Sequence, residues 1–257
     1  MTIIDTIIFS VTLIMVYMSV WFVIAQIIKR NDVADIAWGL GFILLAVTLF
    51  FKDGYAFDRT ALVAMLVVIW GFRLAYHIFK RNVNKPEDKR YANWRNTWGK
   101  WFVVRSFFQI FILQGLLLLL ISSPIIVINH YTGTSWSWLD LLGVLVWIFG
   151  FYFESVGDAQ LKKFISNPEN KGKVLSTGLW KYTRHPNYFG EVTQWWGIWI
   201  ISMSIFPNAI FAIISPLTIT FLILKVSGIP MLEKSMSENP LFADYMKNTS
   251  AFFPKFF

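Results

Sequence analysis

The sequence predicts an all-α, polytopic membrane protein with about seven transmembrane helices and a polar cavity that faces the cytosol. Hydrophobic residues make up 56% of the 257 positions, charged residues only 15%, and the mean hydropathy is +0.55. So few charged side chains cannot cover a water-soluble globule of this length. Apolar runs of roughly 17–25 residues, which suffice to cross the hydrocarbon of a bilayer, recur along the whole chain.

Seven such runs give the predicted spans in order. They lie at residues 3–28, 34–51, 61–79, 102–128, 136–153, 188–206 and 209–226. The fourth is weakened near Pro124, and the sixth begins with polar residues. The first is too long for a signal peptide and lacks a small-residue cleavage site, so we expect it to remain as a helix. No repeat or low-complexity linker interrupts the chain, which predicts a single integral membrane domain over residues 1–257.

The orientation of the spans follows from the basic residues. Lysine and arginine concentrate in alternate connections, at residues 29–33, 80–101 and 154–187 and in the tail from residue 225. The intervening connections, 129–135 and 207–208, carry no lysine or arginine, and segment 52–60 carries as many acidic as basic residues. Because positive residues stay on the cytoplasmic side of a membrane, we expect the N-terminus outside and the C-terminus in the cytoplasm.

The residue types also exclude several kinds of site. The chain has no cysteine, which excludes disulfides, thiolate chemistry and sulfur-ligated metals. Its three histidines, His77, His130 and His185, lack the close spacing of metal ligands, so no metal site is expected. The net charge of +8 is divided among loops beside the membrane with no recognisable binding module, so no nucleic-acid partner is expected. Anionic headgroups are the plain alternative partner of any one of these lysines.

Polar side chains form short stripes at helical spacing, all at the cytoplasmic ends of the predicted spans. The stripes comprise Asp32 and Asp35, Trp70, Arg73 and His77, Arg105 and Gln109, Glu154 and Asp158, and Asn187, Glu191 and Gln194. Charged groups at one depth on several helices can satisfy each other only around a shared wet cavity. A transporter would more often carry polar positions near the midplane, whereas the outer halves of these spans are apolar. The stripes therefore predict a chamber that opens to the cytosol.

Each stripe also has a purely structural interpretation. Asp32, Lys80 and Lys162 suit the membrane interface, where side chains reach water. Internal ion pairs, such as Arg73 with Asp35, would account for other charges without any ligand.

Arginines near carboxylates and amides suit a cytosolic ligand with phosphates, hydroxyls and a carboxamide. Arginine binds phosphate through bidentate hydrogen bonds, a carboxylate accepts from ribose hydroxyls, and an Asn or Glu side chain can hold a nicotinamide carboxamide. No Gly-x-Gly-x-x-Gly motif follows a predicted strand, which excludes a Rossmann domain. A dinucleotide would have to be held by the membrane helices and their loops.

The stretch from Leu179 to Glu191 carries the most specific signal in the chain. It reads Leu-Trp-Lys-Tyr-Thr-Arg-His-Pro-Asn-Tyr-Phe-Gly-Glu. This resembles the Arg-His-Pro-Asn-Tyr-x-Gly-Asp/Glu signature of the steroid 5α-reductase and sterol reductase group, and more loosely that of isoprenylcysteine carboxyl methyltransferases. The resemblance to bacterial 5α-reductase-like proteins extends over nearly the whole chain and includes residues 113–115, 157–162 and 240–254. Its motifs are specific for the superfamily but not for the substrate.

This resemblance implies a seven-helix enzyme of the bacterial inner membrane. The enzyme would take NADPH from the cytosol and deliver hydride to a carbon–carbon double bond conjugated to a carbonyl in a steroid- or lipid-like substrate. Its partners would be this hydrophobic small molecule and membrane lipids, with the oligomeric state left open. By the resemblance, the dinucleotide site would be lined by Arg73, Arg105, Glu154, Asp158, Arg184, His185, Asn187, Tyr188 and Glu191. His77 and Tyr182, from the same stripe and motif, complete the candidates for cofactor binding.

The catalytic candidates are Asp35, Tyr188 and Trp70. Asp35 falls near the position of the acidic residue that, in the resembled family, helps to polarise the substrate carbonyl. Counting back from Arg73, Trp70 occupies the position where that family places a tyrosine hydroxyl. An indole cannot supply a proton at ordinary pH. This departure implies that Asp35 or Tyr188 acts alone, or that the substrate is not a 3-keto steroid.

Two other functions are compatible with the same residues. A membrane methyltransferase would bind S-adenosylmethionine with the same carboxylates and amides, but this ligand has no phosphate and would leave Arg73, Arg105 and Arg184 without a ligand partner. A non-enzymatic, lipid-binding membrane protein would use the stripes as internal ion pairs. The three arginines favour the reductase.

Overall fold

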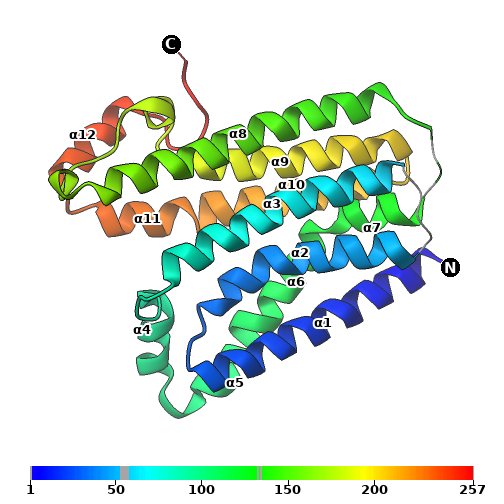
Figure 1. Ribbon diagram of the computed structural model, residues 1–257, viewed down its shortest axis with the longest axis horizontal. Helices are drawn as coiled ribbons and strands as arrows, with labels where there is room; N and C mark the ends of the chain where they lie inside the picture. Colours follow the sequence, from blue (N-terminus) through cyan, green and yellow to red (C-terminus); the bar gives the residue numbers. More distant parts are fainter. Residues whose placement is uncertain (1, 53–57, 132, 134, 257) are drawn as a thin grey trace. The chain divides into compact units, whose positions relative to one another are not determined.

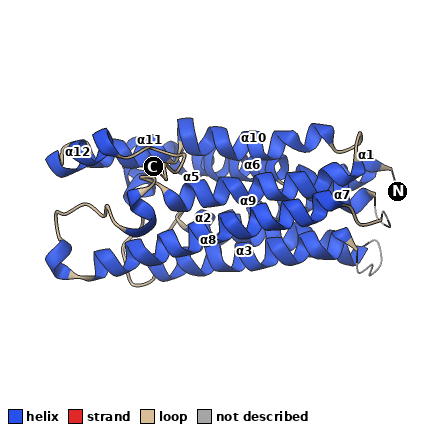
Figure 2. Ribbon diagram, turned by 90° about the horizontal axis from the view of Figure 1, so that it is seen from above, coloured by secondary structure: helices blue, strands red, loops and turns tan. Residues whose placement is uncertain are grey.

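The computed structural model describes residues 2–52, 58–131, 133 and 135–256, and every regular element in these ranges is helical (Figure 1, Figure 2). Six helical segments are long and apolar enough to cross a membrane. They are Ile3–Ile28, Val33–Lys52, Arg59–Asn82, Lys89–Ile121, Trp138–Ser166 and Ile210–Met236. Helix α9 (Pro186–Ser202) has 17 residues, the lower end of the length that crosses the hydrocarbon. The protein is thus an all-α, multi-pass integral membrane protein, and the prediction of about seven spans is confirmed.

The helices gather into two compact units. The first unit contains α1 to α7 together with residues 205–212, and the second contains α8 to α12. The single domain over residues 1–257 stays a prediction. Asp53 of segment 52–60 and the terminal Phe257 lie outside the described residues.

The first unit begins with three long helices, α1 (Ile3–Ile28), α2 (Val33–Lys52) and α3 (Arg59–Asn82). Helix α3 starts at Asp58, whose carboxylate accepts a hydrogen bond from a backbone amide of the first turn, as expected of an N-cap. Glycines let α2 and α3 pack closely, because a Cβ atom added to Gly39 would lie 2.9 Å from the carbonyl oxygen of Gly71.

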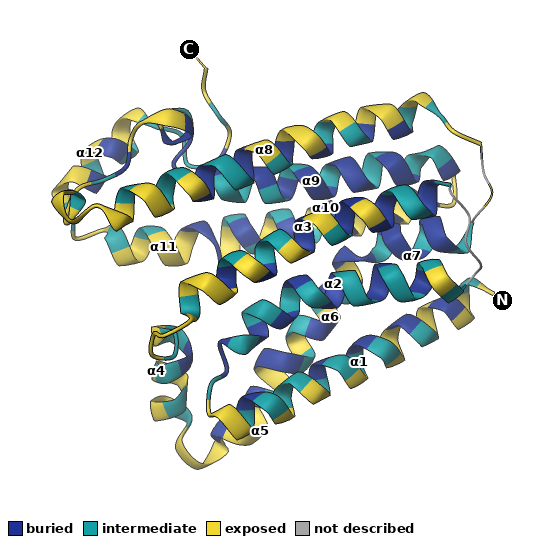
Figure 3. Ribbon diagram, in the orientation of Figure 1, coloured by how far each residue is buried: buried dark blue, intermediate teal, exposed yellow. Residues whose placement is uncertain are grey.

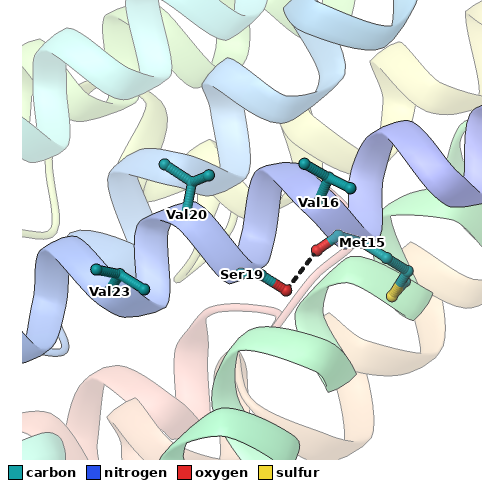
Figure 4. A pocket seen from close by; sticks show the side chains of 5 residues that line it. All are labelled: Met15, Val16, Ser19, Val20 and Val23. Atoms are coloured by element: carbon teal, nitrogen blue, oxygen red, sulfur yellow. Dashed lines mark hydrogen bonds between the residues drawn. The ribbon is translucent and has the colours of Figure 1, made fainter.

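Helix α1 presents a largely exposed apolar face (Figure 3). A shallow groove on this face is lined by Met15, Val16, Ser19, Val20 and Val23 (Figure 4). Its one polar side chain, Ser19, donates its hydroxyl to the carbonyl oxygen of Met15 at 2.8 Å, so the groove offers no free donor. An apolar face of this kind suits contact with lipid tails, because every polar group within it is satisfied inside the helix.

The fourth predicted span is broken, as the weakening near Pro124 indicated. Its first part consists of α5 (Phe102–Ser106), a π-helical turn (Phe107–Ile112) and α6 (Leu113–Ile121), and the interruption lies at Ser122, before α7. Pro124 lies in the first turn of α7 (Ser123–His130), where proline is tolerated because no intrahelical partner is needed for its missing N–H.

The second unit is built on two antiparallel helices, α8 (Trp138–Ser166) and α9. Glycines form a seam between them: a Cβ atom added to Gly190 would lie 2.4 Å from the carbonyl oxygen of Gly150 and 2.4 Å from the amide nitrogen of Glu154. A second contact joins Gly143 to Gly197, where such an atom would lie 2.6 Å from the carbonyl oxygen. Small residues let helix backbones approach each other in membranes, and this seam fixes which side chains of α8 and α9 meet.

Two regions that were predicted to be connections between spans contain helices. Segment 80–101 includes α4 (Lys89–Trp98), and the tail from residue 225 includes α11 (Ile229–Met236) and α12 (Pro240–Asn248), beyond α10 (Ile214–Phe221). Helix α8 also continues past the predicted end of its span at residue 153. These short helices are polar on one side, so a search for long apolar runs does not find them.

Candidate functional site

Two acid–amide pairs join α8 to α9 inside the second unit. Asn187 donates its amide Nδ2 to the carboxylate Oδ1 of Asp158 at 3.0 Å. Farther along the helices, one turn from Asp158 on α8 and two turns from Asn187 on α9, Gln194 donates its Nε2 to Oε2 of Glu154 at 2.6 Å. Glu154 and Gln194 are only 2% and 1% exposed, so this pair is cut off from solvent. The two stripes predicted on these helices therefore do face each other.

The same amides each keep one unused acceptor. The buried oxygen atoms Asn187 Oδ1 and Gln194 Oε1 have no hydrogen-bond partner within the described residues. An unsatisfied buried oxygen costs roughly 1–3 kcal/mol, so such atoms point to a missing donor. A ligand could provide this donor, because an amide N–H or a hydroxyl group would form a hydrogen bond with Asn187 Oδ1.

Arg184 and His185 meet a glutamate from α11. Arg184 donates its Nε to the carboxylate oxygen Oε1 of Glu233 at 2.8 Å, and the His185 ring nitrogen Nε2 lies 3.0 Å from the same oxygen. The guanidinium also donates through Nη1 to the backbone carbonyl oxygens of Met246 and Thr249. We call Arg184, His185 and Glu233 the clasp, because they tie the segment before α9 to α11 and to the end of α12.

The backbone around the clasp is bonded to the C-terminal segment. The Arg184 amide donates to the carbonyl oxygen of Ser250 at 2.8 Å, and the Lys255 amide donates to that of Tyr182 at 2.9 Å. The fully buried Thr183 donates its hydroxyl to the carbonyl oxygen of Phe252 at 2.9 Å. The first half of the Arg-His-Pro-Asn signature is therefore held by the protein itself, while Asn187 and Glu191 lie on α9.

Burial lowers the pKa of His185, and the nearby Arg184 lowers it further, against the opposing effect of Glu233. In the unfolded chain the ring takes up a proton near pH 6.5. The folded protein keeps the ring neutral, so above that pH the protonation of His185 does not oppose folding. As the pH falls below the unfolded-state pKa toward the lower pKa of the folded protein, the unfolded chain binds the proton first and the folded state loses stability. We therefore compare the Tm at about pH 7.5 and about pH 5.5, one unit on either side of the unfolded-state pKa. We expect the Tm of the wild-type protein to fall more over this interval than the Tm of His185→Gln. Equal decreases in thermal unfolding scans would show that His185 is not responsible.

In the first unit, Asp35 lies in a cluster with α4. Tyr91 donates its hydroxyl to Oδ1 of Asp35 at 2.7 Å, and Arg90 donates Nη2 to Oδ2 at 3.0 Å. Tyr91 is 3% exposed, whereas Arg90 is half-buried. A tyrosine hydroxyl of α4 therefore lies beside Asp35.

Asp32 does not reach water, contrary to its interfacial interpretation. It is 2% exposed and forms a bidentate ion pair with Arg30, with distances of 3.1 Å from Nε and 2.7 Å from Nη2. The neighbouring Arg95 pairs with Glu87 at 3.0 Å. The second predicted span thus begins with buried, paired charges, because the start of α4 lies against this end of α2, where the Asp88 amide donates to Asp32 at 3.3 Å.

The remaining candidates are placed as follows. Trp70 is buried and packs edge-on against Phe42 at 5.4 Å between ring centroids. Arg105 is exposed, with its guanidinium carbon 6.0 Å from the Trp98 ring. Tyr188 stacks on His185 at 5.7 Å. Arg73, His77, Tyr182 and Glu191 are partly exposed, and their cofactor roles stay predictions.

Sequence reasoning missed Arg90, Tyr91 and Glu233 as members of polar clusters. Glu233 lies in a tail whose lysines indicated only topology. For Tyr91 a signal was available: Asp88 caps α4 through the Arg90 amide at 2.9 Å, and Tyr91 and Arg95 recur at i and i+4 on one face of that short helix.

Comparison with known proteins places the chain in a family. Residues 21–249 match the family described as "Protein of unknown function (DUF1295)". A protein of Schizosaccharomyces pombe that is described as uncharacterized is 28% identical over 240 residues, which cover 80% of this chain and 67% of the relative. No solved structure matches the chain. Because the family match includes both the Asp35 cluster and the acid–amide pairs, and extends over most of the sequence, the chain belongs to the DUF1295 family.

Proposed function

We propose that this protein is an NADPH-dependent membrane reductase that acts on a carbon–carbon double bond conjugated to a carbonyl in a steroid- or lipid-like substrate. The proposal rests on the resemblance of residues 179–191 to the reductase signature and on the acid–amide pairs between α8 and α9. It places the C-terminus in the cytoplasm of a bacterial cell, where NADPH is available, and the N-terminus outside the inner membrane.

The single observation that carries the proposal is the unused Oδ1 atom of Asn187. Its Nδ2 is already held by Asp158, which fixes the direction of the amide. The carboxamide of nicotinamide presents an N–H donor, so the residues present fit this end of NADPH. Bound NADPH would supply the hydride, while Asn187 and Asp158 orient the ring and the closely packed helices exclude water.

The phosphates of NADPH require cations near the same ends of the helices. In the second unit, Lys162, Lys163, Lys171, Lys173 and Lys181 are exposed, and none has a carboxylate partner within the described ranges. We assign phosphate contacts to this group in preference to Arg184, because the guanidinium of Arg184 is engaged by Glu233 and two carbonyl groups.

Reduction of an enone also requires a group that stabilises the developing negative charge on the carbonyl oxygen. We assign this role to Asp35, the position that the resemblance indicates, and we assign Tyr91 a positioning role, because it donates its one hydroxyl proton to Asp35 at 2.7 Å. One such donor in a dry site is typically worth about 3–4 kcal/mol of transition-state stabilisation.

Replacement of Asn187 by alanine tests the cofactor assignment. We expect NADPH to bind the wild-type protein, with a change in nicotinamide fluorescence, and to bind Asn187→Ala about tenfold more weakly, because one hydrogen bond and the orientation of Asp158 are lost. Asn248→Ala is the matched control, since this exposed amide on α12 bonds only to the backbone of its own helix. Its affinity for NADPH should equal that of the wild-type protein.

The same titration separates the competing functions. The engagement of Arg184 within the protein removes one of the three arginines that favoured NADPH over S-adenosylmethionine. Binding of S-adenosylmethionine, but not NADPH, with sensitivity to Asn187→Ala would establish the methyltransferase instead. Binding of neither would leave the non-enzymatic, lipid-binding function. If NADPH binds, consumption of its absorbance with a panel of steroid and polyprenyl enones identifies the substrate.

A further inference from the structure

We propose that exposed lysine, arginine and tryptophan side chains of α4 and of the residues on either side of it bind the phosphate-bearing headgroups of anionic phospholipids. We call this the α4 surface; it consists of Lys85, Lys89, Trp94, Lys100, Trp101 and Arg105, all of which are exposed. The inference does not depend on the proposed reductase activity.

The basic residues of the α4 surface lack acidic partners within the protein. The nearby carboxylates are already used, because Glu87 pairs with Arg95 at 3.0 Å and Asp88 pairs with Arg90 at 3.1 Å. Lys85, Lys89, Lys100 and Arg105 have no carboxylate within salt-bridge distance in the part of the chain that the structure describes. Four cations without counter-ions on one short segment attract an external anion.

The aromatic residues of the α4 surface indicate that this anion belongs to a membrane. Trp94 stacks on Trp98 with ring centroids 5.3 Å apart and planes 6° apart. Trp101 is 57% exposed, with the Lys100 ammonium 6.0 Å from its ring. Tryptophan is enriched at the membrane–water interface, where its apolar ring meets lipid and its N–H meets the headgroups. A site for a free anion in water has no need of exposed indoles.

The position and anchoring of α4 agree with an interfacial role. The helix lies between α3 and α5, and it runs crosswise to α3 (Figure 1). Its inner side is fixed by the bonds of Tyr91 and Arg90 to Asp35. Lys89 lies on the opposite side of the helix from Tyr91 and therefore has a set direction, as in amphipathic helices that lie in the plane of the headgroups. Trp94 lies beside Tyr91, with ring centroids 5.4 Å apart, at the edge of the anchored side.

Removal of the four charges tests the proposal. The full-length protein in detergent would be mixed with equal amounts of phosphatidylglycerol and phosphatidylcholine, and the bound lipids counted by native mass spectrometry. We expect the wild-type protein to retain phosphatidylglycerol preferentially. In the variant Lys85→Gln/Lys89→Gln/Lys100→Gln/Arg105→Gln this preference should be about tenfold weaker. Its Tm should stay close to that of the wild-type protein, because none of the four groups has a carboxylate partner among the described residues.

A matched variant controls for general positive charge. Lys162→Gln/Lys163→Gln/Lys171→Gln/Lys173→Gln removes as many exposed cations from the second unit and leaves the α4 surface intact. It should retain the preference, and Trp94→Ala/Trp101→Ala should weaken it. Equal loss in both charge variants, or no preference in the wild-type protein, would overturn the proposal. Displacement of the lipid by equimolar inorganic phosphate would assign the surface to free phosphate and also overturn it.

Discussion

Gly190→Leu is expected to lower the stability of the protein by about 3 kcal/mol or more, or roughly 6–12 °C in Tm. A Cβ atom at this position would lie 2.4 Å from both the carbonyl oxygen of Gly150 and the amide nitrogen of Glu154. Both neighbours are backbone atoms, so α8 and α9 would have to separate. Separation would also break the bonds of Asn187 and Gln194 to the facing carboxylates, and the variant should lose any ligand that the wild-type protein binds.

Thermal unfolding in detergent, followed by circular dichroism, measures the change. Ala159→Leu is the control, because it adds the same side chain at an exposed position of α8. Its Tm should stay close to that of the wild-type protein. A stable Gly190→Leu variant would mean that α8 and α9 do not pack through the glycine seam.

Arg184→Ala is expected to release the C-terminal segment and to lower stability by about 3 kcal/mol, because it leaves two carbonyl oxygens without their donor and leaves the partly buried Glu233 with His185 as its remaining clasp partner. Limited proteolysis with trypsin should then cut faster at Lys247, which lies between the carbonyl groups that Arg184 holds. The rate of cleavage, followed by mass spectrometry, is the readout.

Two further variants define the cause. Lys181→Ala removes a nearby exposed cation that has no carboxylate partner among the described side chains, and it should leave cleavage unchanged. Arg184→Ala/Glu233→Ala should recover part of the lost stability, since no partly buried carboxylate remains without its arginine. If Arg184→Ala resists trypsin as well as the wild-type protein, the clasp does not hold the C-terminal segment.

The long helices could be predicted from the sequence because each apolar run is a local property. The facing stripes of α8 and α9 could also be predicted, since Glu154 and Asp158 on one helix and Asn187 and Gln194 on the other recur at helical spacing. Their register could not, because it depends on where Gly150 meets Gly190.

The partners of Asp35 and Arg184 were beyond sequence reasoning. Tyr91 lies 56 positions from Asp35, and Glu233 lies 49 positions from Arg184. Both partners come from short helices whose polar residues look like those of ordinary loops. Arg184 illustrates the difficulty: an arginine inside a binding signature predicts a ligand contact, yet its side chain bonds to the protein itself.

The clasp has a consequence for how the protein is made. The segment around Arg184 emerges from the ribosome well before Glu233, Met246 and Thr249, which supply its partners. Until those residues are synthesised, a buried guanidinium and the backbone of residues 182–184 lack their hydrogen-bond acceptors and donors. The second unit can therefore reach its final packing only late in translation, and ribosomes stalled before residue 245 should carry an α8–α9 pair that a protease still attacks.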